Sequence, residues 1–236
     1  MDTWKVSSKV LLLCMIFNKH ARVVIQDRNR AQSREEERAN AITHALGLLF
    51  CIIATPFALW KAYQPGNMQF FYATIVFGIG MVMVYFFSST YHYVKSPATK
   101  AVMRKLDHIS IYFLIAGTYT PLMIRYLPSE TATIFLWIMW VIVAVGVLYK
   151  IFFFDRWEWL SVLSYVALGW MLVFVIKPLW QSMPVPVITW IVVGGISYMT
   201  GVYFYLKDHK LYYHSVWHLL VLCGTVFHFV SVFLSC

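Results

Sequence analysis

The sequence predicts an all-α polytopic membrane protein, a bundle of seven transmembrane helices with a cytoplasmic N-terminus. Of the 236 residues, 61% are apolar and only 12% are charged, about half the charged fraction of a soluble domain. The apolar residues form seven segments, each about long enough to cross a hydrocarbon core of roughly 30 Å as a helix. Aromatic residues make up 18% of the chain, as expected for aromatic belts at both membrane interfaces.

The seven predicted spans form one transmembrane domain over residues 35–236, because no loop between them is long enough to fold separately. Clusters of Pro, Gly, Asn and Asp separate the spans. Prolines inside them predict kinks at Pro56, Pro121 and Pro178. The spans lie at approximately residues 41–63, 69–92, 107–126, 131–153, 159–180, 187–206 and 211–235.

Residues 1–34 form a basic segment ahead of the first span. Its apolar run at residues 10–17 is too short to cross a bilayer. No cleavage site of small residues follows that run, so a signal peptide is not indicated. We interpret residues 1–34 as a cytoplasmic arm that is interfacial or disordered.

The distribution of Lys and Arg predicts the orientation of the bundle. Residues 1–40 and the second, fourth and sixth loops hold eight, four, two and two Lys or Arg, sixteen of the nineteen in the chain. Only Lys61, Arg125 and Lys177 fall on the other side. Because cytoplasmic loops carry the excess of Lys and Arg, this asymmetry places the N-terminus inside. The formal charge of +9 therefore indicates contact with anionic lipid headgroups, and not a nucleic-acid partner.

Three histidines carry the pattern of a metal site. His214 and His218 are four residues apart, so on a helix both imidazoles lie on one face. The predicted orientation places His92, at the end of the second span, at the same depth in the inner leaflet. Three histidines with one coordination position left for water are typical of catalytic zinc. The alternative is three separate polar side chains, each satisfied by hydrogen bonds between helices.

Asp107 and Ser88 are the candidate catalytic residues beside these histidines. Asp107 opens the third predicted span at the same depth, where it would orient or deprotonate a water molecule, or merely cap the helix. Ser88 lies one turn before His92 and would orient a ligand or a substrate carbonyl, or bond to its own helix backbone. A polar face at the start of the first span is interpreted as structural, tying this span to its neighbours near the site; it comprises Glu37, Asn40, Thr43 and His44.

Five motifs in this order resemble the bacterial hemolysin III proteins. They are Glu37-x-x-Asn-x-x-Thr-His44, Ser88-x-x-x-His92, Asp107-His-x-x-Ile-Tyr112-Phe, Ala116-Gly-Thr-Tyr-Thr-Pro121 and His214-x-x-x-His218. Those proteins are similar to the progestin and adiponectin receptor family and, more distantly, to alkaline ceramidases. The resemblance covers about residues 35–235.

The resemblance implies zinc on His92, His214 and His218, with Asp107 reaching a water at the metal and Ser88 nearby. It also implies a multi-pass protein of the inner cell membrane. The leading functional hypothesis is a zinc-dependent intramembrane hydrolase whose substrate is a membrane lipid amide or ester. The alternatives are a sensor of the membrane in which zinc is structural and lipid is the ligand, and a pore-forming cytolysin.

Overall fold

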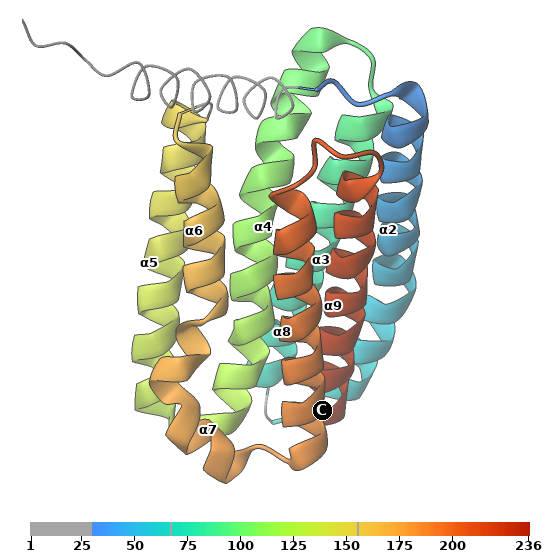
Figure 1. Ribbon diagram of the computed structural model, residues 1–236. Helices are drawn as coiled ribbons and strands as arrows, with labels where there is room; N and C mark the ends of the chain where they lie inside the picture. The colour runs from blue at the N-terminus through green and yellow to red at the C-terminus, as the bar shows by residue number, and fades with distance from the viewer. Residues whose placement is uncertain (1–29, 67, 155) are drawn as a thin grey trace, which may run out of the picture.

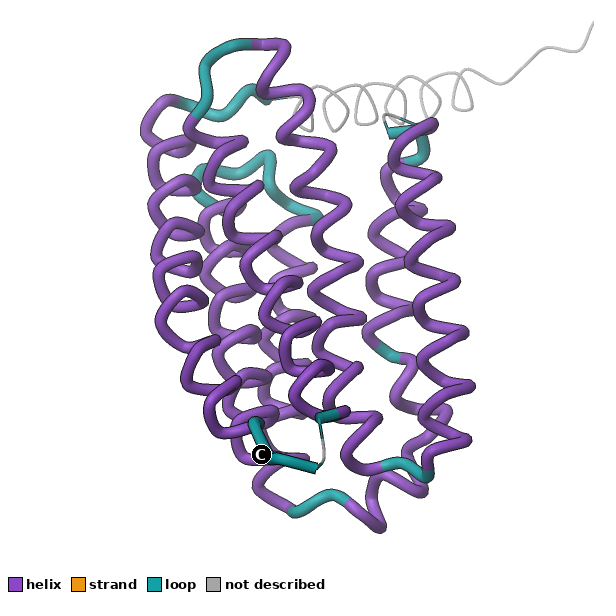
Figure 2. Tube along the Cα trace, turned by 180° about the vertical axis from the view of Figure 1, so that it is seen from behind, coloured by secondary structure: helices purple, strands orange, loops and turns teal. Residues whose placement is uncertain are grey.

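The computed structural model describes residues 30–66, 68–154 and 156–236. Throughout these ranges the chain is helix or short connecting loop, with no strand (Figure 2). The prediction of an all-α protein is confirmed. Most of the predicted arm, including its apolar run, lies outside the described residues.

The first two helices of the described chain pack as an antiparallel pair. α2 (Arg34–Ala62) begins with a capping box, in which Ser33 Oγ accepts the Glu36 N–H and the Glu36 carboxylate accepts the Ser33 N–H. α3 (Gln69–Tyr93) returns beside it. The first helix thus starts about two turns before the predicted span, and these turns carry polar residues that reach the histidines.

The central helix of the bundle is α4 (Pro97–Tyr126), which contacts α3, α5, α6, α7 and α9 (Figure 1). It packs closely on α3, because a Cβ at Gly80 would lie 2.6 Å from the Phe113 carbonyl oxygen. The helix starts ten residues before Asp107, so the predicted start of the third span was too late. The turns of α4 outside the apolar segment carry the basic residues of the second loop.

The next two passes are less regular. α5 (Ser129–Phe153) is one continuous helix. The fifth pass divides into α6 (Glu158–Gly169), a 3₁₀ segment η1 (Met171–Val175) and α7 (Ile176–Ser182). Pro178 follows the 3₁₀ segment, and its ring has no N–H for the preceding turn. The kink predicted at this proline is therefore a full interruption of the helix.

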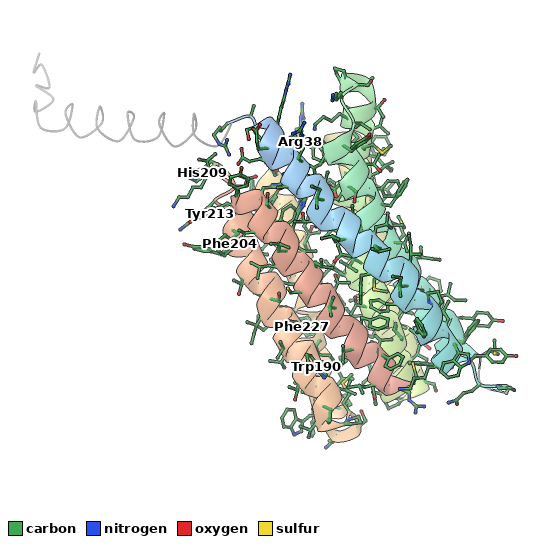
Figure 3. The ribbon with its side chains drawn as sticks, turned by 90° about the vertical axis from the view of Figure 1, so that its right-hand side faces the viewer. Arg38, Trp190, Phe204, His209, Tyr213 and Phe227 are labelled. Atoms are coloured by element: carbon green, nitrogen blue, oxygen red, sulfur yellow. The ribbon has the colours of Figure 1, made fainter. Side chains whose placement is uncertain are left out.

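The chain finishes with the pair α8 (Val185–Tyr205) and α9 (Tyr213–Ser235), and α9 also packs against α2 (Figures 1 and 3). Segments far apart in sequence are thereby neighbours. The starts of α2, α4, α6 and α9 and the finishes of α3, α5 and α8 lie at one end of the bundle (Figure 1), which we call the histidine end.

The surface and the interior have the polarity of a membrane protein. Six helical passes of the described chain are long and apolar enough to cross a membrane. α4 is not among them, and it is the helix that contacts the largest number of the other described helices. Large apolar side chains such as Trp137 and Phe174 are 70% and 85% exposed, whereas polar Asn40, His218 and Lys150 are buried. An apolar surface around a partly polar interior is the reverse of a soluble protein, and it is stable when lipid covers the surface.

Candidate metal centre

The structure brings His92, His214 and His218 together at the histidine end. One ring nitrogen from each lies within 4.8 Å of the others. The ring centroid of His92 lies 5.2 Å from that of His214 and 5.0 Å from that of His218. α3 supplies the first histidine from its last turn, and α9 supplies the other two from its first two turns.

The size of this group suits a single ion. A point equidistant from three atoms 4.8 Å apart lies about 2.8 Å from each, against about 2.0–2.1 Å in zinc–histidine sites. Each nitrogen would therefore move by less than about 1 Å to bind zinc. Side-chain rotation alone covers such a distance, so the backbone already has the geometry that a shared ion requires.

Unsatisfied nitrogens point to the same conclusion. Nε2 of His92 and Nε2 of His218 are buried and have no hydrogen-bond partner among the described residues, and Nδ1 of His214 is likewise without one. A buried polar atom without a partner is costly. The donor set of three neutral imidazole nitrogens is the one that zinc prefers, so the residues present fit zinc.

His92 is held in place by Glu37. Its Nδ1 lies 2.8 Å from Glu37 Oε2, and the other carboxylate oxygen accepts a hydrogen bond from Lys100 at 2.9 Å. A carboxylate on Nδ1 keeps the proton there and leaves Nε2 as the lone-pair donor, the usual arrangement behind a metal-binding histidine. Glu37 belongs to the polar face that the sequence predicts to tie the first span to its neighbours, and this contact agrees with that interpretation, although His92 as its specific partner was not predicted.

The same polar face of α2 holds the start of α9. Ser215 donates to Asn40 Oδ1 at 2.5 Å. Nδ1 of His218 lies 3.3 Å from the Asn40 carbonyl and 3.4 Å from the Thr43 hydroxyl, which again leaves Nε2 free. His44 stacks on the His218 ring with centroids 3.6 Å apart. The sequence signal for this supporting role was the group of acidic and polar residues in the first turns of α2, the helix that starts beside His92.

The two candidate catalytic residues lie side by side. Asp107 is buried within α4 and lies beside the Ser88 hydroxyl, which has no other hydrogen-bond partner among the described residues. The alternative that Asp107 caps its helix is wrong, because the N-cap is Ser96. The alternative that Ser88 bonds to its own helix backbone is also not seen. Asp107 lies outside the group of three mutually close histidine nitrogens.

The other described histidines lie elsewhere. His108 Nδ1 is 3.3 Å from Lys150 Nζ, on the side of α4 that faces α5. His228 contacts the Ile191 carbonyl through Nε2 at 3.1 Å, deeper in the bundle. Neither belongs to the metal-ligand group.

Comparison with known proteins places the whole bundle in one family. The haemolysin-III related family matches residues 32–229. Hemolysin-3 of Bacillus cereus is 35% identical over 198 residues, 84% of this chain and 90% of that protein. The Hemolysin-3 homolog of Bacillus subtilis (strain 168) is 35% identical over 202 residues, 86% of this chain and 95% of that protein.

More distant similarity extends to animals. Human monocyte to macrophage differentiation factor is 25% identical over 206 residues, covering 84% of this chain and 83% of that protein. No solved structure matches the chain. The extent of the family match and the similarity to the two Bacillus proteins show that this chain is a multi-pass membrane protein of the haemolysin-III related family.

Proposed function

We propose that this protein is a zinc-dependent intramembrane hydrolase that cleaves a lipid amide or ester. The observation that carries the proposal is the set of three histidine nitrogens within 4.8 Å of one another, on rings that each have a buried nitrogen without a hydrogen-bond partner among the described residues. Three protein ligands leave a coordination position open, as in catalytic zinc sites, whereas structural zinc sites are closed by four.

Zinc at this centre would polarise a substrate carbonyl and lower the pKa of a water molecule. Asp107 is the group that moves protons: its carboxylate accepts one from the water that adds to the carbonyl carbon. It then returns that proton to the amide nitrogen or ester oxygen as the bond from this atom to the carbonyl carbon breaks. The products are a carboxylic acid and an amine or alcohol. Ser88, whose hydroxyl is otherwise unbonded, donates to the substrate carbonyl.

The surroundings of the centre favour a lipid substrate. His214 is partly exposed, with a side chain that is 14% accessible. Its ring lies beside Trp217, with centroids 4.8 Å apart, and Trp217 packs on Tyr205 at 4.6 Å. These aromatic faces offer an apolar surface to an acyl chain. The connecting loops are short, so a substrate reaches the centre through the bilayer.

A sensor in which zinc is structural is the second candidate function. The anchoring of His92 by Glu37 and of His218 by α2 ties three helices to the ion, which a structural centre would also require. A pore is a weaker candidate, although the Bacillus relatives are named hemolysins. Phe77, Met81 and Tyr85 fill the interior of the bundle, which leaves little lining for an aqueous channel.

The test combines metal analysis with a lipid assay on the purified protein in detergent. We expect about one zinc per chain, and release of fatty acid from a panel of ceramide-like and ester lipids. Asp107→Asn should keep its zinc and lose at least about a hundredfold of the rate, because general-base catalysis contributes about 10² to 10⁴. His218→Ala should lose both zinc and activity.

Three outcomes would change the proposal. Equal rates for wild type and Asp107→Asn would remove Asp107 from the chemistry. No fatty-acid release by the zinc-loaded wild type across the panel would favour the sensor. Ion flux through purified protein in liposomes, abolished by the same variants, would favour the pore.

A further inference from the structure

A buried carboxylate joins the start of α2 to the start of α9 at the histidine end of the bundle. Glu36 is 2% exposed. Its two oxygens accept hydrogen bonds from both terminal nitrogens of Arg30, at 2.8 and 2.6 Å. The Ser33 N–H also donates to it at 2.9 Å, and so does the Tyr212 N–H, at 2.9 Å across 176 residues of sequence.

Arg30 makes a second connection to the same loop. Its Nε donates to the carbonyl of His209 at 2.9 Å. Residues 206–212, which we call the α8–α9 loop, are therefore held at His209 by Arg30 and at Tyr212 by Glu36. Figure 3 shows His209 and Tyr213 at the histidine end, at the same end of the bundle as Arg38 on α2. The loop is thus attached to a helix that is distant from it in sequence.

The backbone at Tyr212 needs such support. Tyr212 has φ 60° and ψ 4°, the left-handed region that disfavours bulky side chains. It is the N-cap of α9, yet no side chain of the loop caps this helix. His214 is only the second residue of α9, in the turn where helices fray. The direction of the His214 ring therefore depends on how firmly Tyr212 is held.

We infer that Glu36, with Arg30, is a positioning residue for the metal ligand His214. By accepting the Tyr212 N–H it fixes the left-handed residue that starts α9, and so keeps His214 facing His92 and His218. The inference rests on the proposed function only where it concerns zinc. Asp208, in the same loop, lies 3.6 Å from His214 Nδ1, so the hydrogen bonds of Glu36 and Arg30 to this loop also set the distance between these two side chains.

The experiment measures the backbone and the metal separately. The variants are Glu36→Ala and the conservative Glu36→Gln, with Glu35→Ala as the matched control, because Glu35 is exposed on the same turn of α2. In the full-length protein in detergent, without metal, hydrogen exchange of the amides at residues 209–216 should become at least about tenfold faster in Glu36→Ala. Glu35→Ala should exchange like wild type.

The zinc measurement follows release to an excess of chelator. Supporting groups behind metal ligands typically contribute 10- to 100-fold in affinity, and we expect zinc to leave Glu36→Ala about tenfold faster than wild type. Adding Tyr212→Asn should restore most of this loss, because asparagine tolerates the left-handed region best among the non-glycine residues. A role in general stability would not produce that rescue.

The two proposals fail in different ways. If the wild type binds no zinc, the proposed function is overturned, and hydrogen exchange still decides the role of Glu36. If Glu36→Ala and Glu36→Gln leave exchange at residues 209–216 unchanged, the inference is overturned whatever the metal content. Faster exchange with unchanged zinc release would likewise remove Glu36 from the positioning of His214.

Discussion

The contact between Glu37 and His92 gives the sharpest prediction about the metal centre. Glu37→Gln keeps the size of the side chain but removes its charge. His92 Nδ1 and Lys100 Nζ lie 2.8 and 2.9 Å from two different carboxylate oxygens, and glutamine offers an oxygen at only one of these two positions. One of the two donors therefore faces the amide NH₂ group, and the basicity of His92 Nε2 falls.

The expected loss follows from the role of such carboxylates. Removing the partner of a metal-bound histidine typically weakens metal binding 10- to 100-fold, which corresponds to about 1.4–2.7 kcal/mol. The Glu37 side chain is 26% accessible, so solvent can partly replace the lost bond, and we expect the lower half of that range. A competition titration of purified protein against a fluorescent zinc chelator measures the change directly.

Two controls separate this effect from a general loss of stability. Glu35→Gln changes an exposed carboxylate two residues away and should bind zinc like wild type. Lys100→Ala removes the neighbouring cation but keeps the bond from Glu37 to His92, so its zinc affinity should fall by less than the affinity of Glu37→Gln does. Unchanged zinc affinity in Glu37→Gln would refute the reasoning, since it would show that His92 needs no carboxylate.

Three further predictions test the ligands, the helix packing and the orientation. His92→Ala should lose most of the bound zinc, whereas His228→Ala should keep it, as metal analysis after chelator treatment would show. Equal zinc retention by the two variants would mean that the ligand set is wrong. Gly80→Ala should lower the melting temperature, because its Cβ would lie 2.6 Å from a backbone oxygen and such overpacking costs about 1–3 kcal/mol. An unchanged melting temperature would show that α3 and α4 separate easily. Reporter fusions in the second and sixth loops should read cytoplasmic and those in the first and fifth external, and an external reading in the second loop would reverse the orientation.

Much of the architecture could be predicted because it depends on local properties of the chain. Segment length and apolarity decide whether a helix can cross a bilayer, and both are read directly from the sequence. The periodicity of the helix then places His214 beside His218. The order of the spans puts His92 at the same end, and the structure brings all three together.

Helix limits were less predictable. The apolar segment marks the part of a helix that lipid covers, but α4 begins ten residues before Asp107, in a stretch that includes Lys100, Arg104 and Lys105. This extension removes the helix-cap interpretation of Asp107. The break of the fifth pass at residues 171–175 likewise exceeded the kink expected from Pro178.

The sequence by itself determined the fold class, the number of passes and the set of histidines that could share an ion, since hydrophobic length and helical spacing are properties of single segments. Only the tertiary structure decided which groups support those histidines. Glu36 and Glu37 are adjacent in sequence, yet one holds the start of α9 and the other holds His92 on α3. Their partners lie 176 and 55 residues away, and the rotation of each helix about its axis, set by packing against its neighbours, brings them within hydrogen-bond distance.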